Sequence, residues 1–313
     1  MSSTAITTAI LFTNKYLRAR ISNRNGNSSK IKVNSLCTFV LQAPQSTLNT
    51  HFHIPQERYA RQVIHSIWQV EGFTSFQNEI IIPKGVVEII FNFKDPVAAQ
   101  INGKSYYLPG CFINGFNTVP VQLRLPEFQH FFGVRLQPLA IKKIFGTPGA
   151  EFLDVAIDLT LIDKSINTLW HQLAEESDFN KRTKIFIKWI TRRTFDWHPQ
   201  EQLMNNFLCA INLHDLTATT LANTICYSPR HLSRKILETT GMNTEEILHY
   251  KKYLHALHLM HQSNLSLTAI TYQSHFADQS HFIRSFRQYS GMTPGAFRRN
   301  HSHQKGHIYE NVR

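Results

Sequence analysis

The stretch DQSHFIRSFRQYSGMTPGAFRR, residues 278–299, shows most clearly how the C-terminal part of the chain folds. Phe282, Phe286 and Tyr289 recur at the three- to four-residue spacing of one helix face, which predicts a helix with a buried aromatic stripe. An acidic N-cap precedes this helix, and Gly291 is a typical residue for ending it. The opposite side of the helix is polar, and burial of the aromatic stripe does not explain it. That polar side is therefore a candidate contact surface.

The same pattern occurs earlier in the chain, because LANTICYSPRHLSRKILETTGMN (221–243) resembles ITYQSHFADQSHFIRSFRQYSGMT (270–293). Arg234 corresponds to Arg284, an offset of 50 positions. Each copy predicts a short helix, a tight turn and a second helix, which is a helix-turn-helix unit. The expected helices span 217–224 and 229–239 in the first copy, and 267–274 and 279–289 in the second, with a linking helix over 245–262.

The exposed sides of the two second helices carry side chains that suit DNA bases. Arginine can make two bonds to guanine, glutamine can pair with adenine, and isoleucine can contact a thymine methyl group in the major groove. A solvated helix face is the other interpretation of such residues, but a twofold occurrence at fixed spacing favours DNA. The predicted base-reading residues are Arg230, Ser233, Arg234, Gln279, Ser280, Ile283 and Arg284. The predicted phosphate-contacting residues, which orient the protein on DNA, are Arg287, Lys251, Lys252, Arg298 and Arg299.

The positive net charge of the chain favours a polyanionic partner. The 313 residues contain 33 Lys and Arg against 21 Asp and Glu, a formal net charge of +12, which favours nucleic acid or an acidic surface. Residues 1–50 contain no acidic residue and mix Ser, Thr and Asn with basic residues. We predict a poorly ordered basic leader there, solvated in one interpretation and touching DNA in the other.

Residues 51–195 have a different pattern of apolar and turn residues. Short apolar runs such as EIIIPKG and VVEIIFNFKDP are separated by turn residues, which indicates an antiparallel sheet curled into a small barrel or sandwich. Helical patterns follow beyond Pro138. The predicted fold class is α+β: a leader (1–50), a β-rich sensor domain with a helical extension (51–195), an all-α domain of two helix-turn-helix units (196–300) and a tail (301–313).

Other chemistry has weaker support. The cysteines, Cys37, Cys111, Cys209 and Cys226, form no CxxC pair, and the chain has no GxSxG, P-loop or HExxH motif. We therefore predict no enzyme, no catalytic or metal residue and no cofactor. Cys111 as a nucleophile or redox sensor is the alternative to a small buried residue. The histidines at 249, 255, 258 and 261 are interpreted as surface residues of one helix, with metal sensing as the alternative.

Effector-binding residues are not identifiable. Several aromatic residues are candidates either for a ligand cavity or for plain core: Trp68, Phe91, Phe93, Tyr106, Tyr107, Phe112 and Phe116. No run of about 18 apolar residues suggests a membrane span, and no secretory signal is recognised, so we expect a cytoplasmic protein without a membrane partner.

The segments ADQSHFIRSFRQYSGMTPGAFRR and SPRHLSRKILETTGM resemble the DNA-binding domain of the AraC/XylS family of bacterial transcription regulators. The resemblance covers about the last hundred residues and implies a seven-helix domain, promoter binding and usually activation through RNA polymerase. It also implies that six residues fall at base-reading positions: Arg230, Ser233, Arg234, Gln279, Ser280 and Arg284. Residues upstream, around IWQVEG and IIPKGVVEIIFNF, weakly resemble an uncharacterised sensor domain found before this module.

The chain departs from the family pattern at the turns. Cys226 and His275 stand where the family usually has glycine, and a side chain at positive φ costs on the order of 1 kcal/mol. Thr271 replaces a small alanine, and Asn243 and Thr244 replace a proline-containing turn. These changes concern the geometry of the turns.

The predicted function is a sequence-specific regulator, an activator of transcription in which the N-terminal domain controls two recognition helices. Its expected partners are double-stranded promoter DNA, RNA polymerase, an unknown small-molecule effector and a second copy of the chain. One alternative is a ligand-binding or enzymatic β domain whose DNA-binding tail serves autoregulation. A second alternative is a non-specific nucleic-acid binder that uses its basic leader.

Overall fold

The computed structural model describes residues 47–310 apart from 194–195, 212–215, 301 and 303–305. These residues all fall within one compact unit. The predicted leader lies outside the described residues as far as residue 46.

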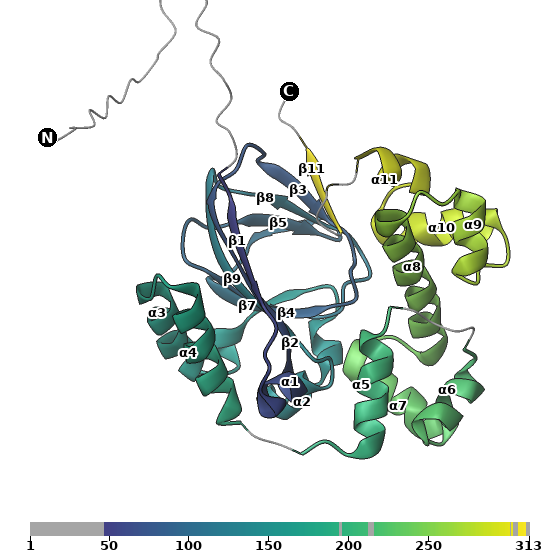
Figure 1. The fold of residues 1–313 in the computed structure, drawn as a ribbon, viewed down its shortest axis with the longest axis horizontal. Coiled ribbons are helices and arrows are strands. Elements are labelled where there is room, and N and C mark those ends of the chain that lie inside the picture. The colour runs from purple at the N-terminus through teal and green to yellow at the C-terminus, as the bar shows by residue number, and fades with distance from the viewer. Residues whose placement is uncertain (1–46, 194–195, 212–215, 301, 303–305, 311–313) are drawn as a thin grey trace, which may run out of the picture. The chain divides into compact units, whose positions relative to one another are not determined.

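Two antiparallel sheets form a sandwich, as the sequence pattern predicted, and strands β1 to β10 come from the N-terminal part of the chain (Figure 1). The larger sheet has the strand order β1-β2-β9-β4-β7-β10 and the smaller one β11-β3-β8-β5-β6. The strands of the larger sheet are β1 (Asn49–His53), β2 (Ile64–Phe73), β4 (Val87–Asn92), β7 (Cys111–Asn114), β9 (Phe128–Leu136) and β10 (Ala156–Asp158). Those of the smaller sheet are β3 (Asn78–Ile81), β5 (Ala98–Ile101), β6 (Lys104–Tyr107), β8 (Val121–Arg124) and β11 (His307–Glu310).

A helical hairpin covers the larger sheet. Helices α3 (Ser165–Glu175) and α4 (Phe179–Thr191) pack against it, and Phe91, Phe132 and Phe186 meet there with ring centroids 6.1 to 6.2 Å apart. All three phenylalanines have 0% exposure. Alternate residues of a strand share one face of a sheet, so β4 and β9 each supply an apolar row to this layer. Short helical elements complete the N-terminal domain: α1 (Arg58–Val63), α2 (Ala140–Phe145), η1 (Gly149–Phe152) and η2 (Leu159–Leu161).

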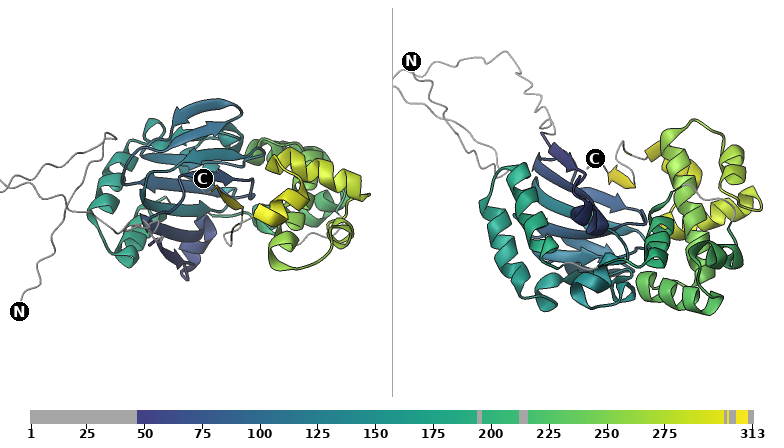
Figure 2. Two further views of the ribbon diagram at one scale, coloured as in Figure 1. Left: turned by 90° about the horizontal axis from the view of Figure 1, so that it is seen from above. Right: turned by 60° about the horizontal axis from the view of Figure 1, so that its bottom comes forward.

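The C-terminal part is helical, and Figure 2 shows it beside the sandwich, away from α3 and α4. The described part of residues 199–300 contains seven helices, the number that the family resemblance implies. They are α5 (Pro199–Cys209), α6 (Ala218–Ile225), α7 (Pro229–Thr240), α8 (Thr244–Gln262), α9 (Leu267–Gln273), α10 (Gln279–Ser290) and α11 (Pro294–Asn300). None of the helices in the described ranges is long and apolar enough to cross a membrane.

The chain returns to the sandwich after α11, where the sequence suggested only a tail. Strand β11 pairs antiparallel with β3, His307 opposite Ile81 and Glu310 opposite Asn78. Ile308 is buried, and the ring of Tyr309 stacks on that of Phe76 at 3.8 Å. The last described residues thus tie the helical domain to the edge of the smaller sheet.

Candidate nucleic-acid interface

The two helix-turn-helix units begin and end their second helices at the predicted caps. The side chain of Ser228 accepts a hydrogen bond from the His231 N–H (3.3 Å), and that of Asp278 accepts one from the His281 N–H (2.7 Å). Each cap satisfies one of the N–H groups that a helix leaves unpaired at its start. Both helices end at a left-handed glycine, Gly241 and Gly291, each with φ of 75°. The starts and ends of α7 and α10 are therefore fixed by local chemistry.

Cys226 and His275 occupy left-handed positions in the two turns, with φ of 59° and 57°. These are the positions at which the resemblance implies glycine. The N–H of Cys226 donates to the carbonyls at the end of α6, which is the usual way to close a helix here. The Nζ of Lys252 donates to the carbonyl of His275 at 2.8 Å. Both turns thus keep the backbone shape for which glycine is suited, at the cost of local strain.

The apolar sides of the recognition helices are buried, as predicted. Leu232 and Ile236 of α7 are 1% and 0% exposed, and Phe282 and Phe286 of α10 are both at 0%. Tyr289 packs on Tyr253 of α8, with ring centroids 4.8 Å apart. The linking helix α8 therefore forms part of the core that orients α10.

The predicted base-reading side chains lie on the opposite sides of α7 and α10. Ile283 is half-buried and the others are exposed, namely Arg230, Ser233, Arg234, Gln279, Ser280 and Arg284. Within the described part of the chain, the guanidinium groups of Arg230, Arg234 and Arg284 have no hydrogen-bond or ion-pair partner. Each helix thus presents a short set of donors near its N-terminal end, where recognition helices contact bases.

Lys251 is a correction to the predicted phosphate contacts. The residue is 2% exposed, and its Nζ donates to the carbonyls of Leu208 (3.0 Å) and Ala210. These carbonyls lie at the end of α5, where the last turn of a helix lacks intrahelical partners. The prediction was wrong because the ammonium group is used inside the protein and cannot reach a phosphate.

The other predicted phosphate contacts differ in exposure. Arg287 and Arg299 are exposed, whereas Lys252 and Arg298 are half-buried. A guanidinium nitrogen of Arg298 donates to the carbonyl of Leu265 at 2.8 Å. Phosphate contact by these four residues stays a prediction, and it is simplest for Arg287 and Arg299.

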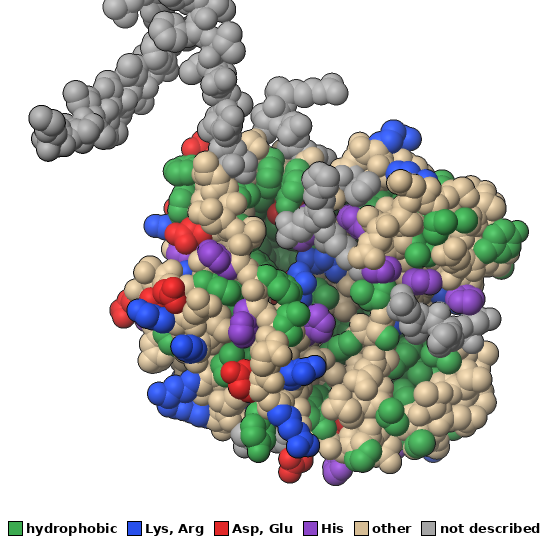
Figure 3. All heavy atoms as spheres, viewed as in Figure 1, with side chains coloured by type: hydrophobic (Ala, Val, Ile, Leu, Met, Phe, Trp, Pro, Cys, Tyr) green, Lys and Arg blue, Asp and Glu red, His purple; other side chains and the backbone are tan. Residues whose placement is uncertain are grey.

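The histidines of α8 are half-buried rather than freely exposed, and Figure 3 shows histidine side chains gathered over α8 and α9. The Nε2 of His249 lies 2.9 Å from the hydroxyl of Ser285, and its ring stacks on that of His281 at 5.3 Å. Burial lowers the pKa of His249, and the neighbouring His281 and Lys252 lower it further. Among residues that the structure describes, no group of three or more His, Cys, Asp or Glu side chains could hold a metal ion.

The described cysteines are all free: Cys111 is buried, Cys209 is half-buried and Cys226 is exposed. Burial raises the pKa of the Cys111 thiol well above its usual value. A protonated, buried thiol is a poor nucleophile, which favours the interpretation of Cys111 as a small core residue. Cys37 lies outside the described residues.

Two tyrosines of α8 attach the helical domain to the sandwich. The hydroxyl of Tyr250 donates to the carbonyl of Asn117 (2.7 Å) and accepts from the N–H of Gly85 (3.0 Å). The hydroxyl of Tyr253 donates to the carbonyl of Pro83 at 3.1 Å. Sequence reasoning missed both contacts, because the pattern of α8 shows only that these tyrosines lie on a buried side.

The end of α7 also contacts the sandwich side. Glu238 pairs with Lys142 of α2, and a Cβ placed on Gly149 of η1 would come within 2.1 Å of the carbonyl oxygen of Thr239. Gly149 is therefore needed for this close approach. Helix α7 contacts the N-terminal domain at its C-terminal end, while Arg230 and Arg234 nearer its N-terminal end stay exposed.

A small cavity of about 60 Å³ lies between the two sheets. Apolar side chains of β3, β5 and β8 line it together with Lys84, Glu88 and Asn117. Glu88 accepts hydrogen bonds from the Nε of Arg135 (2.7 Å) and the Nε1 of Trp68 (3.1 Å). Burial opposes ionisation of Glu88, but Lys84 and Arg135 lower its pKa to about 2. The side-chain oxygen of Asn117 is buried without a hydrogen-bond partner among the described residues.

Few of the aromatic candidates from the sequence line this cavity. Phe112 does, whereas Phe91 and Phe116 belong to the hydrophobic core. Tyr107 is 72% exposed. Most of these residues are thus ordinary core or surface residues, the alternative that the sequence left open.

Comparison with known proteins gives a separate match for each of the two domains. Residues 221–300 match the family profile described as "Helix-turn-helix domain", and residues 52–158 match a "Domain of unknown function (DUF6597)". The HTH-type transcriptional regulator GlxA of Rhizobium meliloti is 34% identical over 84 residues, which are 27% of this chain and 26% of GlxA. The HTH-type transcriptional activator RhaS of Escherichia fergusonii is 32% identical over 78 residues, 25% of this chain and 28% of RhaS.

The chain therefore spans only about a quarter of the length of these curated relatives. Among solved structures, ToxT of Vibrio cholerae covers 81% of this chain and 97% of its own length at 13% identity, with a TM-score of 0.41. The resemblance of the C-terminal residues to regulators of the helix-turn-helix class is confirmed by the profile and the two relatives.

Proposed function

We propose that this chain, whose residues 221–300 match a helix-turn-helix profile and resemble the DNA-binding domain of the AraC/XylS family, is a sequence-specific, DNA-binding activator of transcription. Helices α7 and α10 read successive major grooves of one promoter site. The proposed domain boundaries are those expected from the sequence, 51–195 for the sensor and 196–300 for the DNA-binding domain. A protein that binds promoters acts in the cytoplasm of a bacterium.

The observation that carries the proposal is the pair of exposed polar faces on α7 and α10. Each face carries arginines with no partner among the described residues, and each stands on a helix with its apolar side in the core. An arginine held in this way can donate two hydrogen bonds to one guanine. Helix α8, 19 residues long, joins the two units rigidly. A rigid pair of readers is suited to a bipartite site about one helical turn long.

Sequence selection from a random DNA pool with the full-length protein tests this proposal. We expect a bipartite site to be enriched, and we expect Arg284→Ala to relax base preference in one half only. An arginine that reads a guanine contributes about 1–3 kcal/mol of discrimination. Binding to all sequences with equal affinity and a steep salt dependence would reject the proposal in favour of non-specific binding.

Control by the N-terminal domain is the second part of the proposal. The hydrogen bonds of Tyr250 and Tyr253 to loops of the sandwich provide a physical connection between the two domains. The wall of the cavity between the sheets includes Asn117, whose carbonyl also binds Tyr250. At about 60 Å³ this cavity is smaller than the 300–1,000 Å³ of ordinary ligand sites, so a small-molecule effector bound there would have to widen it. Contact with RNA polymerase and formation of a homodimer complete the proposed partners.

The alternative is a ligand-binding or enzymatic β domain with a DNA-binding tail used for autoregulation. The proteins matched by the C-terminal residues are transcription regulators, which favours regulation as the main activity. A reporter fused to the selected promoters distinguishes the two. Regulation of genes other than the protein's own would reject the alternative.

A further inference from the structure

The imidazole of His249 in α8 contacts recognition helix α10 and the turn before it. Its Nε2 lies 2.9 Å from the hydroxyl of Ser285, and its ring stacks on that of His281 with 14° between the ring planes. The ring of Phe276, in the turn, meets the imidazole edge-on at 6.1 Å. Ser285 and Phe276 are buried. His249 therefore lies where α8, the turn and α10 come together.

The stacked partner of His249 belongs to the reading segment of α10. His281 directly follows Ser280 and precedes Arg284 by three residues, so the side chains of His281 and Arg284 lie on neighbouring parts of the helix surface. The rotation of α10 that places the His281 ring on His249 thus also sets the direction of the Arg284 side chain. A binding group must be held within about 0.5 Å and 10–20° of its working geometry.

The groups that face His249 disfavour a proton on its ring. Burial lowers its pKa, and the neighbouring His281 and Lys252 lower it further. Tyr289 also packs on the ring, at 6.0 Å, and stays neutral because burial and Glu246 raise its pKa to about 12. Protonation of both stacked rings therefore brings two positive charges together beside an ammonium group.

The acidic groups near this stack have other partners or face solvent. Glu246 accepts a hydrogen bond from an N–H group at the start of α8, and Asp278 accepts one from the N–H of His281 at the start of α10, both at 2.7 Å. Glu245 is exposed in the first turn of α8. Among the residues that the structure describes, no carboxylate forms an ion pair with the ring of His249 or His281.

The first helix-turn-helix unit is built differently. His231 of α7 corresponds to His281, but its ring stacks on that of Tyr227 in its own turn, with centroids 4.4 Å apart. The face of an aromatic ring attracts a cation, so a proton on His231 faces a neutral ring and not a second imidazole. Acid therefore acts on the packing of α10 more than on that of α7.

We propose that His249 is a positioning residue that makes base reading by α10 dependent on pH: its neutral ring holds α10 in the reading orientation, and its protonated ring does not. The proposal rests on the proposed function, because it concerns the same reading helices. His249 acts through α10 and is not itself on a reading face. Because its pKa is lowered from 6.5 in the folded chain, this packing is fully stable above pH 6.5 and weakens as the pH falls below that value.

Base preference in each half of the selected DNA site, measured against pH with the full-length protein, tests this proposal. The readout is the affinity for the selected site divided by that for a site with one half altered. Protonation of other histidines strengthens binding to any DNA and cancels in this ratio. From about pH 7.5 to 5.5 we expect the preference in the α10 half to fall by about tenfold, while that in the α7 half stays constant.

Two variants of His249 separate its charge from its packing. His249→Ala loses the contacts with α10, and we expect the preference in the α10 half to be about tenfold lower already at pH 7.5. His249→Gln keeps a group that can bond to the hydroxyl of Ser285 but cannot be charged. It therefore recovers part of the preference at pH 7.5 and makes it independent of pH.

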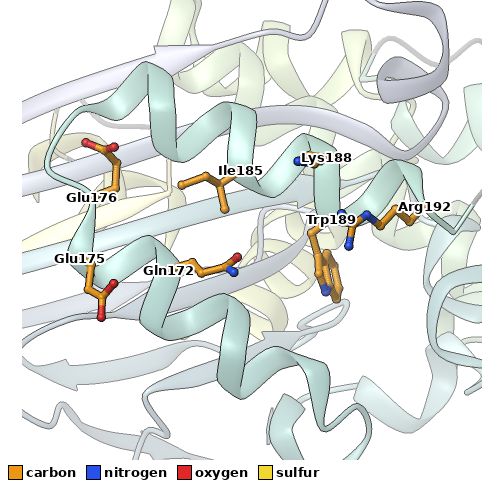
Figure 4. Close-up of a pocket in the computed structure, with 7 residues that line it drawn as sticks. All are labelled: Gln172, Glu175, Glu176, Ile185, Lys188, Trp189 and Arg192. Carbon is orange, nitrogen blue, oxygen red and sulfur yellow. The ribbon is translucent and has the colours of Figure 1, made fainter.

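Two further variants are controls. His255→Gln changes a half-buried histidine of the same helix that faces His258 and His275, and it keeps the pH dependence of the wild type. Lys188→Gln removes a positive charge from the N-terminal domain, where Figure 4 shows Lys188 in a groove of about 480 Å³ along α3 and α4. It leaves the base preference and its pH dependence unchanged, which excludes an effect of net charge.

Three results would overturn the proposal. The preference in the α10 half is independent of pH in the wild type, or His249→Gln keeps the wild-type pH dependence, or His255→Gln abolishes it. Any of these results, together with base preference in both halves at pH 7.5, rejects the role of His249 alone. Equal affinity of the wild type for all sequences at pH 7.5 rejects the proposed function, and the role of His249 with it.

Discussion

Replacement of Tyr250 by phenylalanine tests the contact between α8 and the sandwich. The ring stays in place, but the hydroxyl that donates to the carbonyl of Asn117 and accepts from the N–H of Gly85 is lost. Tyr250 is 0% exposed and Asn117 is buried, so water does not replace the bond at the carbonyl. A buried polar group without a partner costs about 1–3 kcal/mol. The N–H of Gly85 also loses its partner, at a smaller cost because Gly85 is half-buried. We expect the free energy of unfolding to fall by about 2–3 kcal/mol.

Urea unfolding measures this loss, and amide hydrogen exchange at Gly85 locates it. Tyr253→Phe is the matched control, because Tyr253 is equally buried but makes one such hydrogen bond, to the carbonyl of Pro83. Its expected loss is about 1–2 kcal/mol. Wild-type stability of Tyr250→Phe, or a smaller loss than that of Tyr253→Phe, would show that the two hydrogen bonds of the Tyr250 hydroxyl do not stabilise the fold. Base preference in a DNA selection stays unchanged in both variants, since neither side chain lies on a reading face.

Further predictions concern the turns, the phosphate contacts and the acid response. Replacing Cys226 or His275 by glycine relieves the strain of a side chain in a left-handed position. The free energy of this strain exceeds the free-energy cost of the more flexible unfolded chain, so each replacement raises the free energy of unfolding in urea by about 0.5 kcal/mol. A lower stability of either variant would contradict this. Arg299→Ala lowers the slope of log affinity against log salt concentration, measured by anisotropy titration of DNA, by about one unit. Lys251→Met leaves this slope unchanged because the ammonium group of Lys251 is buried. Equal slopes for both variants would contradict a phosphate contact by Arg299 alone. Burial opposes the ionisation of Glu88, but its basic neighbours lower its pKa from 4.5 to about 2. The stability that ionised Glu88 contributes to the fold is therefore complete above pH 4.5 and is lost as the pH falls towards 2. The melting temperature of Glu88→Gln therefore depends less on pH between 4.5 and 2 than that of the wild type. An identical pH dependence in both proteins would show that ionised Glu88 does not stabilise the fold.

The recognition helices could be predicted from the sequence because their signals are local. The spacing of Phe282 and Phe286 gives the buried side of α10, the carboxylate of Asp278 gives its start and Gly291 gives its end. A local pattern also gave the left-handed turn at His275, through the resemblance to a family with glycine there. Each of these features needs only residues within one or two turns of helix.

Features that depend on distant partners could not be predicted. Strand β11 has four residues, and its pairing depends on β3, so that the side chain of His307 meets Glu79 across 228 positions of sequence. A basic residue in a helix looks the same whether it faces phosphate or a carbonyl, which is why Lys251 was placed on the surface. Its true environment is the end of α5, a segment that sequence spacing does not locate in space.

Two recognition helices on one chain, held at a fixed separation by α8, are proposed to read two successive grooves of one DNA site. The most direct test measures the affinity of the full-length protein for its selected site and for the same site with five base pairs inserted between the halves. This insertion rotates one half by about half a helical turn, and α8 cannot follow it. We predict that affinity falls to that of a single half-site. Equal affinity for both DNAs would show that α7 and α10 do not read the site as a rigid pair.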